Sequence, residues 1–172
     1  WSGPFIMATA NTRVVRRSEA LLALRQESYG SNFTYQEHAY HKSWLSAVSS
    51  LLLTGLSVLV LLSPLKRLVK PFLPKPGEGP SVAVQENGWF DCKFIAESED
   101  GTKSVFNMHG KGDPGYKVTS KLVSECALCL IEDIEQLPGG RGYGGVLTSA
   151  SGLGHSLISR LTKVGIDFKG PL

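Results

Sequence analysis

Charge and cysteine are both scarce in this sequence. Charged residues make up 19% of the 172 residues, and the formal net charge of +3 is too small to indicate a nucleic-acid partner. The three cysteines, Cys92, Cys126 and Cys129, are too few for a disulfide framework, which favours a reducing, intracellular compartment. No signal-peptide pattern precedes the first expected helix, and the first residue is Trp1, so we expect the chain to be part of a longer protein.

Charge is missing altogether from Ser43 to Leu65. A helix over this stretch would be about 34 Å long at 1.5 Å per residue, close to the hydrocarbon thickness of a bilayer. Its strongly apolar part is Leu51 to Leu62, which contains Gly55. Small hydroxyl residues fall on one helical stripe, which predicts that the helix packs against protein on that side and lipid on the other: Ser43, Ser46, Ser50, Thr54 and Ser57.

Basic residues follow the uncharged stretch at once, as they do where a helix meets lipid headgroups. A buried core helix is the alternative interpretation. We predict that segment 43–80 is a membrane-contacting insertion. Its proline-rich end, 64–80, is predicted to be a stiff, non-helical exit with one or two short turns at the lipid interface. The residues predicted to contact the membrane are Trp44, Leu51, Leu52, Leu53, Leu56, Val58, Leu59, Val60, Leu61, Leu62, Lys66, Arg67 and Lys70.

The segments on either side predict an α+β fold, with a mixed or antiparallel sheet and flanking helices. Residues 1–42 predict a helix from Thr12, as its cap, to about Gln26, and a strand at 33–40. Residues 81–172 predict the remainder of the same domain, with a hairpin turn at Asp100-Gly101. The elements expected there are strands at Trp89–Glu97, Lys103–His109 and Val146–Thr148, helices at Thr119–Gln136 and His155–Lys163, and an extended end at Ile166–Phe168.

Gly140, Gly142 and Gly145 match the letters of the dinucleotide-binding fingerprint. That fingerprint must leave a strand and open a helix, so that backbone amides point at the pyrophosphate. These glycines instead leave a predicted helix and enter a predicted strand. We therefore predict a flexible connection here and no NAD(P) site in this chain.

A cysteine pair and a histidine pair have the spacing of reactive sites, but their predicted surroundings do not suit such chemistry. Cys126 and Cys129 lie on the apolar face of the predicted helix, so buried thiols that act as small hydrophobes are the better interpretation. His38 and His41 lie at a predicted strand with no third ligand in view, so we predict no metal site. The other residues of that apolar helix face are Leu122, Val123, Leu130, Ile131 and Ile134.

The loop from Gly110 to Thr119 is rich in glycine and lies between a predicted strand and helix. Asp113 and Thr119 can cap the helix, and the glycines permit close approach of a ligand or of another backbone segment. A tight strand-to-helix turn and a ligand-facing loop both fit these residues, and the sequence leaves the choice open.

Several segments, in order along almost the whole chain, resemble saccharopine dehydrogenase-like oxidoreductases. They are Val14-Val-Arg-Arg-Ser18, the apolar stretch Trp44 to Leu65, Gly112-Asp-Pro-Gly-Tyr-Lys-Val-Thr119, Gly144-Gly-Val-Leu-Thr-Ser-Ala-Ser151, and the ending from Leu157 to Phe168. The resemblance is carried by these matches jointly, since each is modest alone. Ser149 departs from the pattern, because proline is usual at that position.

The resemblance implies that an amino-terminal Rossmann domain, which this chain lacks, carries NAD(P), and that this chain closes the cleft as the second domain. It also implies an apolar or lipid-like substrate, since some members resemble enoyl reductases that act on lipid chains. Members are associated with membranes, including mitochondria and lipid droplets. The substrate-cleft candidates that the resemblance indicates are Gly112, Asp113, Gly115, Tyr116, Thr119, Gly145 and Thr148.

Two functions therefore stay open. The first is the membrane-associated carboxy-terminal domain of an NAD(P)-dependent oxidoreductase, with membrane lipid and its own Rossmann domain as partners. The second is a non-catalytic anchor or assembly subunit of a larger membrane complex. In either case we predict monotopic attachment, because a single crossing would separate residues 1–42 from 81–172. A hairpin bent near Gly55, or a helix that dips in from one face, avoids this separation.

Overall fold

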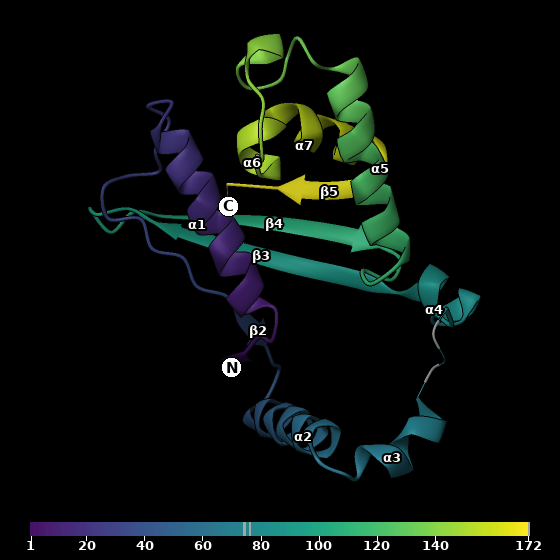
Figure 1. The fold of residues 1–172 in the computed structure, drawn as a ribbon. Helices are drawn as coiled ribbons and strands as arrows, with labels where there is room; N and C mark the ends of the chain where they lie inside the picture. Colours follow the sequence, from purple (N-terminus) through teal and green to yellow (C-terminus); the bar gives the residue numbers. More distant parts are fainter. Residues whose placement is uncertain (74, 76, 172) are drawn as a thin grey trace. The chain divides into compact units, whose positions relative to one another are not determined.

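The structure is a computed structural model that describes residues 1–73, 75 and 77–171, so Pro74 and Pro76 of the predicted exit lie outside the described residues. Contacts divide the chain into one unit at Trp1–Glu78 and a second unit from Gly79 onward. Figure 1 shows the helices and strands of both units. That residues 1–42 and 81–172 form a single domain stays a prediction.

The first unit opens with a small antiparallel ladder and a helix. Strand β1 (Ser2–Pro4) pairs with strand β2 (His38–Tyr40). Helix α1 (Ala8–Ala23) begins before Thr12, because the alanine-rich residues ahead of Thr12 favour a helix, so the prediction of Thr12 as the cap is wrong. The predicted strand is also wrong at residues 33–37, since the pairing with β1 extends over 3 residues only.

Helix α2 (Trp44–Leu62) confirms the helix expected in the uncharged stretch. The Ser43 hydroxyl caps it by accepting a hydrogen bond from the backbone N–H of Ser46 at 3.2 Å. The helix runs without a break through Gly55, so the hairpin bend proposed there is wrong. Helix α3 (Lys66–Val69) and the 3-10 turn η1 (Lys70–Phe72) follow. They confirm the short turns predicted after α2, but the exit is helical at its start and not non-helical as predicted.

The second unit is built on an antiparallel sheet with strand order β3-β4-β5. Strands β3 (Trp89–Glu97) and β4 (Lys103–Lys111) confirm the predicted hairpin, and β5 (Ile166–Lys169) pairs with the far side of β4. At the turn, the Asp100 carboxylate accepts hydrogen bonds from the Ser98 hydroxyl and the Thr102 backbone N–H. These bonds lower the pKa of the Asp100 carboxyl to about 2.

Helices cover one face of this sheet, as Figure 1 shows. The short helix α4 (Val82–Asn87), which the sequence did not predict, precedes β3, and the covering helices are α5 (Lys117–Glu132) and α7 (Gly154–Lys163). Phe90, Met108 and Ile166 project from the covered face into the core. Residues that alternate with them along the strands project from the opposite face. The buried residues of this hydrophobic core are Val118, Cys129, Leu137, Leu153, Leu157, Leu161 and Ile166.

Two predictions for this unit are wrong. Val146–Thr148 is not a strand; it leads into the short helix α6 (Ser149–Gly152), and Thr148 caps that helix. Val123, Leu130 and Ile131 were expected on the buried face of α5, but all three are exposed. The layer that packs on α5 covers a narrower stripe than the apolar residues of this helix occupy.

A group of ion pairs joins α5 to α7. The Arg160 guanidinium on α7 lies 3.1 Å from Glu125, 2.6 Å from Glu132 and 3.0 Å from Asp133. Burial disfavours the charged form of Arg160, but Asp133, Glu125 and Glu132 outweigh it and raise the pKa of the guanidinium. These contacts fix the orientation of α7 and therefore help to place β5, which follows it.

Gly110 provides a test of the packing between sheet and helices. A Cβ atom at this position would lie 2.3 Å from Cε1 of Phe90 and 3.1 Å from Cδ1 of Ile166. We expect Gly110→Ala to lower the free energy of unfolding by about 1–3 kcal/mol, because the partly buried Phe90 ring, which packs against the core, must move. Gly144→Ala is the control, since nothing lies within 4 Å of its added Cβ. Equal denaturant midpoints for the two variants would contradict this packing.

Candidate functional site

Helix α2 presents an apolar surface that the chain leaves uncovered. Of the described helices, α2 alone is long and apolar enough to cross a membrane; its mean hydropathy is 2.2, and 0% of it is buried. Leu52 is 68% exposed, Leu59 65% and Leu62 81%. The predicted membrane-contacting residues of α2 are exposed, except Val60, which is half-buried. We call this set of exposed apolar residues on α2 the α2 surface.

The hydroxyl stripe of α2 is likewise uncovered. Ser46, Ser50 and Thr54 are exposed, so the predicted packing of this stripe against protein does not occur within the described residues. Ser57 donates a hydrogen bond from its hydroxyl to the carbonyl of Leu53 at 2.8 Å. A hydroxyl that is satisfied by its own helix can lie in an apolar medium without an unpaired polar group.

Basic and apolar side chains alternate immediately after α2. Lys66, Arg67 and Lys70 are all exposed, as predicted. Leu68 is 70% exposed and Phe72 is 87% exposed on the same short turns. Cations beside exposed apolar groups are typical of a segment that lies at the boundary between lipid tails and headgroups.

The loop from Gly110 to Thr119 accommodates a neighbouring backbone segment. The N–H of Gly112 donates to the carbonyl of Gly88 at 2.7 Å, and the N–H of Asp113 donates to the carbonyl of Gln85 at 2.9 Å. A Cβ on Gly88 would lie 2.7 Å from the nitrogen of Asp113. The carboxyl end of α4 therefore lies directly against this loop, and the tight-turn interpretation accounts for its glycines.

The predicted caps of α5 have different roles. The Asp113 carboxylate accepts a hydrogen bond from the backbone N–H of Tyr116 at 2.8 Å, just ahead of the helix. Thr119 lies inside α5 and donates its hydroxyl proton to the carbonyl of Pro114. Gly115 lies beside the Asp113 carboxylate. A ligand-facing role for Gly112, Asp113, Gly115, Tyr116 and Thr119 stays a prediction.

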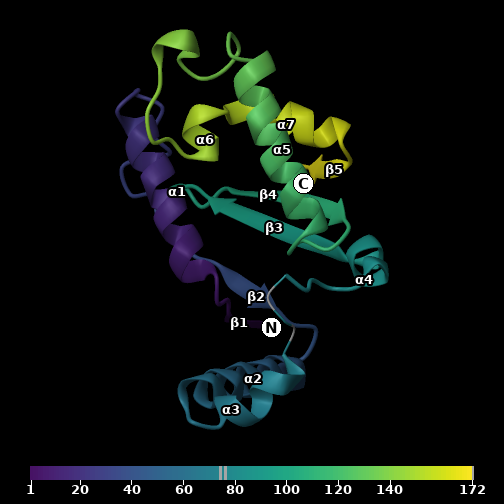
Figure 2. The same cartoon turned by 45° about the vertical axis from the view of Figure 1, so that its right-hand side comes forward.

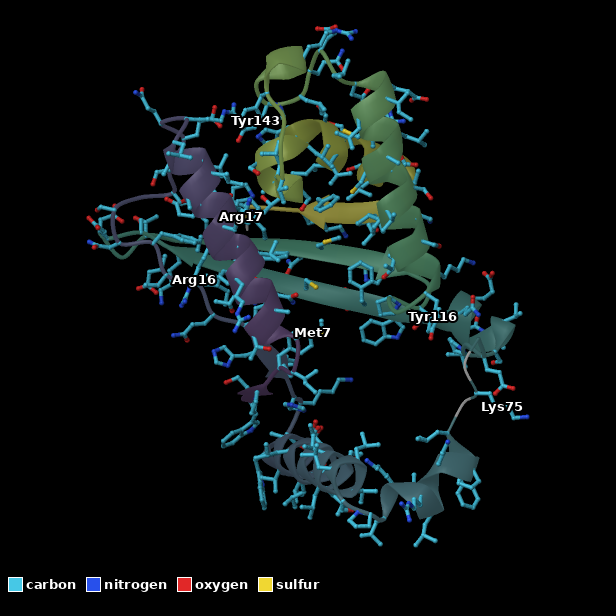
Figure 3. All side chains as sticks on the ribbon, viewed as in Figure 1. Met7, Arg16, Arg17, Lys75, Tyr116 and Tyr143 are labelled. Atoms are coloured by element: carbon cyan, nitrogen blue, oxygen red, sulfur yellow. The ribbon has the colours of Figure 1, made fainter. Side chains whose placement is uncertain are left out.

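The other cleft candidates, Gly145 and Thr148, lie elsewhere in the unit. Thr148 forms a capping box with Ser151: the Thr148 hydroxyl accepts from the Ser151 N–H at 3.3 Å, and the Ser151 hydroxyl accepts from the Thr148 N–H at 3.1 Å. Figure 3 shows Tyr116 beside the start of α5 and Tyr143 in the connection after its end. In Figures 1 and 2, α6 and the loop before α5 lie on different sides of the helical layer, so the two predicted segments are not brought together.

Ser149 occupies the first position of α6, which explains why proline suits this place. Proline is favoured at the first helical position, and Thr148 before it has the extended backbone (φ −97°, ψ 164°) that proline requires of its neighbour. We expect Ser149→Pro to raise the free energy of unfolding by about 0.4–1 kcal/mol. Thermal denaturation beside Ala150→Pro, one position further into the helix, checks this. A Ser149→Pro variant as unstable as Ala150→Pro would contradict the cap.

The thiols of α5 are in the setting predicted for them. Cys129 is buried and Cys126 is half-buried, and neither forms a disulfide. Burial raises the pKa of both thiols; Glu125 adds to the effect at Cys126 and Asp133 at Cys129. A thiol with a raised pKa is a poor nucleophile near neutral pH, so this pair is suited to packing and not to redox chemistry.

A labelling experiment tests this interpretation. Iodoacetamide at pH 7.5 should alkylate the exposed Cys92 well before Cys126 and Cys129, because those two thiols are covered and protonated. Mass spectrometry of tryptic peptides follows each residue, and the same reaction in guanidinium chloride should abolish the differences. Equal rates for all three cysteines in the folded protein would show that the helix face is open.

The glycines of the fingerprint-like motif, Gly140, Gly142 and Gly145, do not connect a strand to a helix. His38 and His41 do not belong to a metal-binding group among the described residues. Gly140–Gly142 forms the 3-10 turn η2, and the chain then continues to α6 without the predicted strand. Gly145 has a positive φ of 133°, which fits a connecting loop. Among the described residues, no three His, Cys, Asp or Glu side chains are grouped so that they could hold a metal ion.

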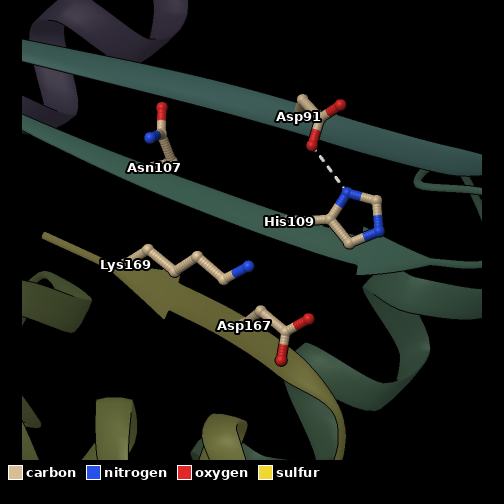
Figure 4. Close-up of a pocket in the computed structure, with 5 residues that line it drawn as sticks. All are labelled: Asp91, Asn107, His109, Asp167 and Lys169. Atoms are coloured by element: carbon tan, nitrogen blue, oxygen red, sulfur yellow. Dashed lines mark hydrogen bonds and ion pairs between the residues drawn. The ribbon is translucent and has the colours of Figure 1, made fainter.

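A polar group that the sequence analysis did not identify lies on the sheet face opposite the helices. Asp91 on β3, His109 on β4 and Asp167 on β5 stand side by side in the strand register. Nδ1 of His109 lies 2.6 Å from Oδ1 of Asp91. Figure 4 shows this pair with Asn107 and Lys169 around it, in a hollow of about 320 Å³ that these five residues line.

Comparison with known proteins finds similarity to mycobacterial reductases. A Mycobacterium tuberculosis protein described as a candidate trans-acting enoyl reductase is 38% identical over 178 residues, covering 98% of this chain and 41% of its own length. The trans-acting enoyl reductases of Mycobacterium leprae and Mycobacterium ulcerans are 33% and 31% identical over 174 residues, covering 96% of this chain and 40% of theirs. No family model and no solved structure matches the chain.

The chain thus spans about two fifths of the length of these relatives. It is homologous to the carboxy-terminal part of mycobacterial trans-acting enoyl reductases, which agrees with the resemblance to saccharopine dehydrogenase-like oxidoreductases.

Proposed function

We propose that this chain is the membrane-associated carboxy-terminal part of an NAD(P)-dependent reductase that acts on the carbon–carbon double bond of a lipid-like acyl chain. The α2 surface carries the membrane half of this proposal, and the homology to trans-acting enoyl reductases carries the chemical half. The remainder of the longer polypeptide would supply the nicotinamide cofactor, because in the glycine turn from β4 to α5 the backbone N–H groups of Gly112 and Asp113 already donate to the carbonyls of Gly88 and Gln85.

The membrane half rests on the cost of leaving α2 in water. Removing a leucine side chain from water is worth about 1.5–3 kcal/mol, and α2 exposes a series of leucines such as Leu52, Leu56 and Leu59. None of α2 is buried by the rest of the described protein. A lipid surface would relieve the cost without requiring a partner of matching shape, and the exposed Lys66, Arg67 and Lys70 would meet its phosphates.

Monotopic attachment fits the unbroken form of α2. A helix that lies in the interface from one face leaves the residues before and after it on the same side of the bilayer, where both can join the soluble part of the enzyme. The organelle, a mitochondrion or a lipid droplet, stays a prediction.

The alternative in which this chain is a non-catalytic anchor requires that the longer protein have no reductase activity. An assay of the full-length protein distinguishes the two functions. Purified protein with NADPH or NADH and a long-chain enoyl thioester in vesicles should oxidise the nucleotide and saturate the acyl chain, as mass spectrometry would detect. Full vesicle binding without any reduction across chain lengths would support the anchor instead.

Membrane binding has its own test. Leu52→Lys with Leu59→Lys should reduce partition into phosphatidylcholine vesicles by about 100-fold or more, since a lysine in the hydrocarbon costs about 2.5–3.5 kcal/mol. Leu24→Lys with Ile131→Lys is the matched control, because Leu24 is 84% and Ile131 is 74% exposed outside α2. Co-sedimentation measures both pairs.

The basic residues give a second arm of the same experiment. Replacing Lys66, Arg67 and Lys70 with serine should weaken binding to vesicles that contain phosphatidylserine by about 1 kcal/mol for each charge, and leave binding to neutral vesicles unchanged. If the doubly substituted α2 variant and its control bind equally well, the α2 surface is not what holds the protein at the membrane.

A further inference from the structure

The sheet of the second unit has two chemically different faces. Phe90, Met108 and Ile166 on one face pack into the helix-covered core. The other face carries Asp91, His109 and Asp167 in one row across the strands. The side chain of His109 is 37% exposed and that of Asp91 is 61% exposed, so this face lies open to whatever approaches it.

The contact between Asp91 and His109 fixes the imidazole ring. An ionised carboxylate can only accept a hydrogen bond, so Nδ1 of His109 donates to Oδ1 of Asp91 across 2.6 Å. Figure 4 shows the second ring nitrogen, Nε2, directed away from Asp91. A carboxylate behind an imidazole sets its tautomer and orients the ring, so that Nε2 is the nitrogen available for proton transfer.

Charged groups of both signs lie on the face of His109, and alternation along β3 and β4 places Lys93 and Lys111 among them. Asp91 and Asp167 lie on the two strands that flank it, and Lys169 extends along the sheet beside Asn107 (Figure 4). The hollow between these side chains, about 320 Å³, has room for a small polar group such as a thioester carbonyl.

Apolar side chains flank this polar hollow along the same face. Trp89 is two residues from Asp91 and is 64% exposed, and Ile95 further along β3 is 63% exposed. Alternation along the strand places both on the face of Asp91. Trp89 offers an acyl chain an apolar contact next to His109, while Lys93 lies between Asp91 and Ile95.

Reduction of an enoyl thioester needs a proton donor at such a place. A hydride from a nicotinamide adds to the β-carbon, the double-bond electrons move toward the thioester carbonyl, and the α-carbon must then take up a proton. We propose that His109 is this acid: its Nε2–H bond breaks as the α-carbon–hydrogen bond forms. Solvent then returns the proton to Nε2, and Asp91 is the positioning residue. The inference rests on the proposed function, which supplies the hydride.

The test uses full-length protein with NADPH, an enoyl thioester and vesicles. His109→Ala should lower kcat by about 10²–10⁴-fold. His155→Ala, an exposed histidine on α7, is the matched control and should leave kcat unchanged. Added imidazole should partly restore the His109→Ala variant. Asp91→Asn should lower kcat with little change in KM, because it disturbs proton transfer and leaves the binding surface in place.

A readout independent of rate comes from the product. In D₂O the wild-type enzyme should place deuterium at the α-carbon in a single configuration, which NMR of the isolated product reports. The His109→Ala variant should give both configurations, because solvent then delivers the deuteron from either side. Circular dichroism and NADPH binding by fluorescence confirm that each variant remains folded.

The outcomes separate the two proposals. A wild-type protein that reduces no enoyl thioester ends the proposed function itself. An active wild type, with a His109→Ala variant that is folded, as fast as His155→Ala and still specific in configuration, overturns the role of His109 and leaves the reductase intact. A slow variant that imidazole does not rescue, and whose product keeps a single configuration, also overturns it.

Discussion

The apolar side chains of α2 find no cover within the described protein, and this constraint underlies the proposed membrane contact. A helix with a buried share of 0% and a mean hydropathy of 2.2 must leave water by meeting something else. Both ends of α2 suit an apolar environment. The Ser43 hydroxyl accepts a hydrogen bond from a backbone N–H at the start, and Lys66 and Arg67 follow the end. Since the chain on both sides of α2 is folded, lipid on one face of the helix reconciles these features.

The register of β3 and β4 determines both the packing of the second unit and the position of its polar group. The Asp100 turn aligns the strands so that Gly110 lies opposite Phe90 and His109 lies opposite Asp91. The first pair leaves space for an aromatic ring in the core, and the second produces the ion pair on the open face. One alignment therefore supports both the packing of the unit and its candidate chemistry, and a slip of one residue would exchange the two faces.

Sequence reasoning located the elements whose pattern is local. The alternation of β3, the Asp-Gly turn and the uncharged run of α2 each have a signal within a few residues, and the structure confirms them. The predictions were wrong where the structure of a segment depends on pairing with residues elsewhere. Val146–Thr148 has strand-like residues, but β4 pairs with β5 on its far side and the Thr148 hydroxyl pairs with Ser151. The Thr-x-x-Ser spacing was the available sign of a cap.

The polar group around His109 was missed for a related reason. Asp91 and His109 are each nine residues from Asp100 and face each other, whereas a two-residue turn at Asp100-Gly101 would have paired Asp91 with Gly110. Asp167 could not be placed in the same way, because its position depends on α7 and on the ion pairs of Arg160. The sequence left open whether the loop from Gly110 to Thr119 is a tight turn or faces a ligand, because α4, whose end contacts this loop, gave no clear signal.

Spin labels along α2 test the central claim most directly. With full-length protein on vesicles, nitroxides at Leu52, Leu56 and Leu59 should relax faster with oxygen, which gathers in lipid, than with a water-soluble nickel chelate. A nitroxide at the exposed Ile131 should show the reverse. If the labels on α2 resemble the label at Ile131, α2 lies in water or against protein, and the membrane account is contradicted.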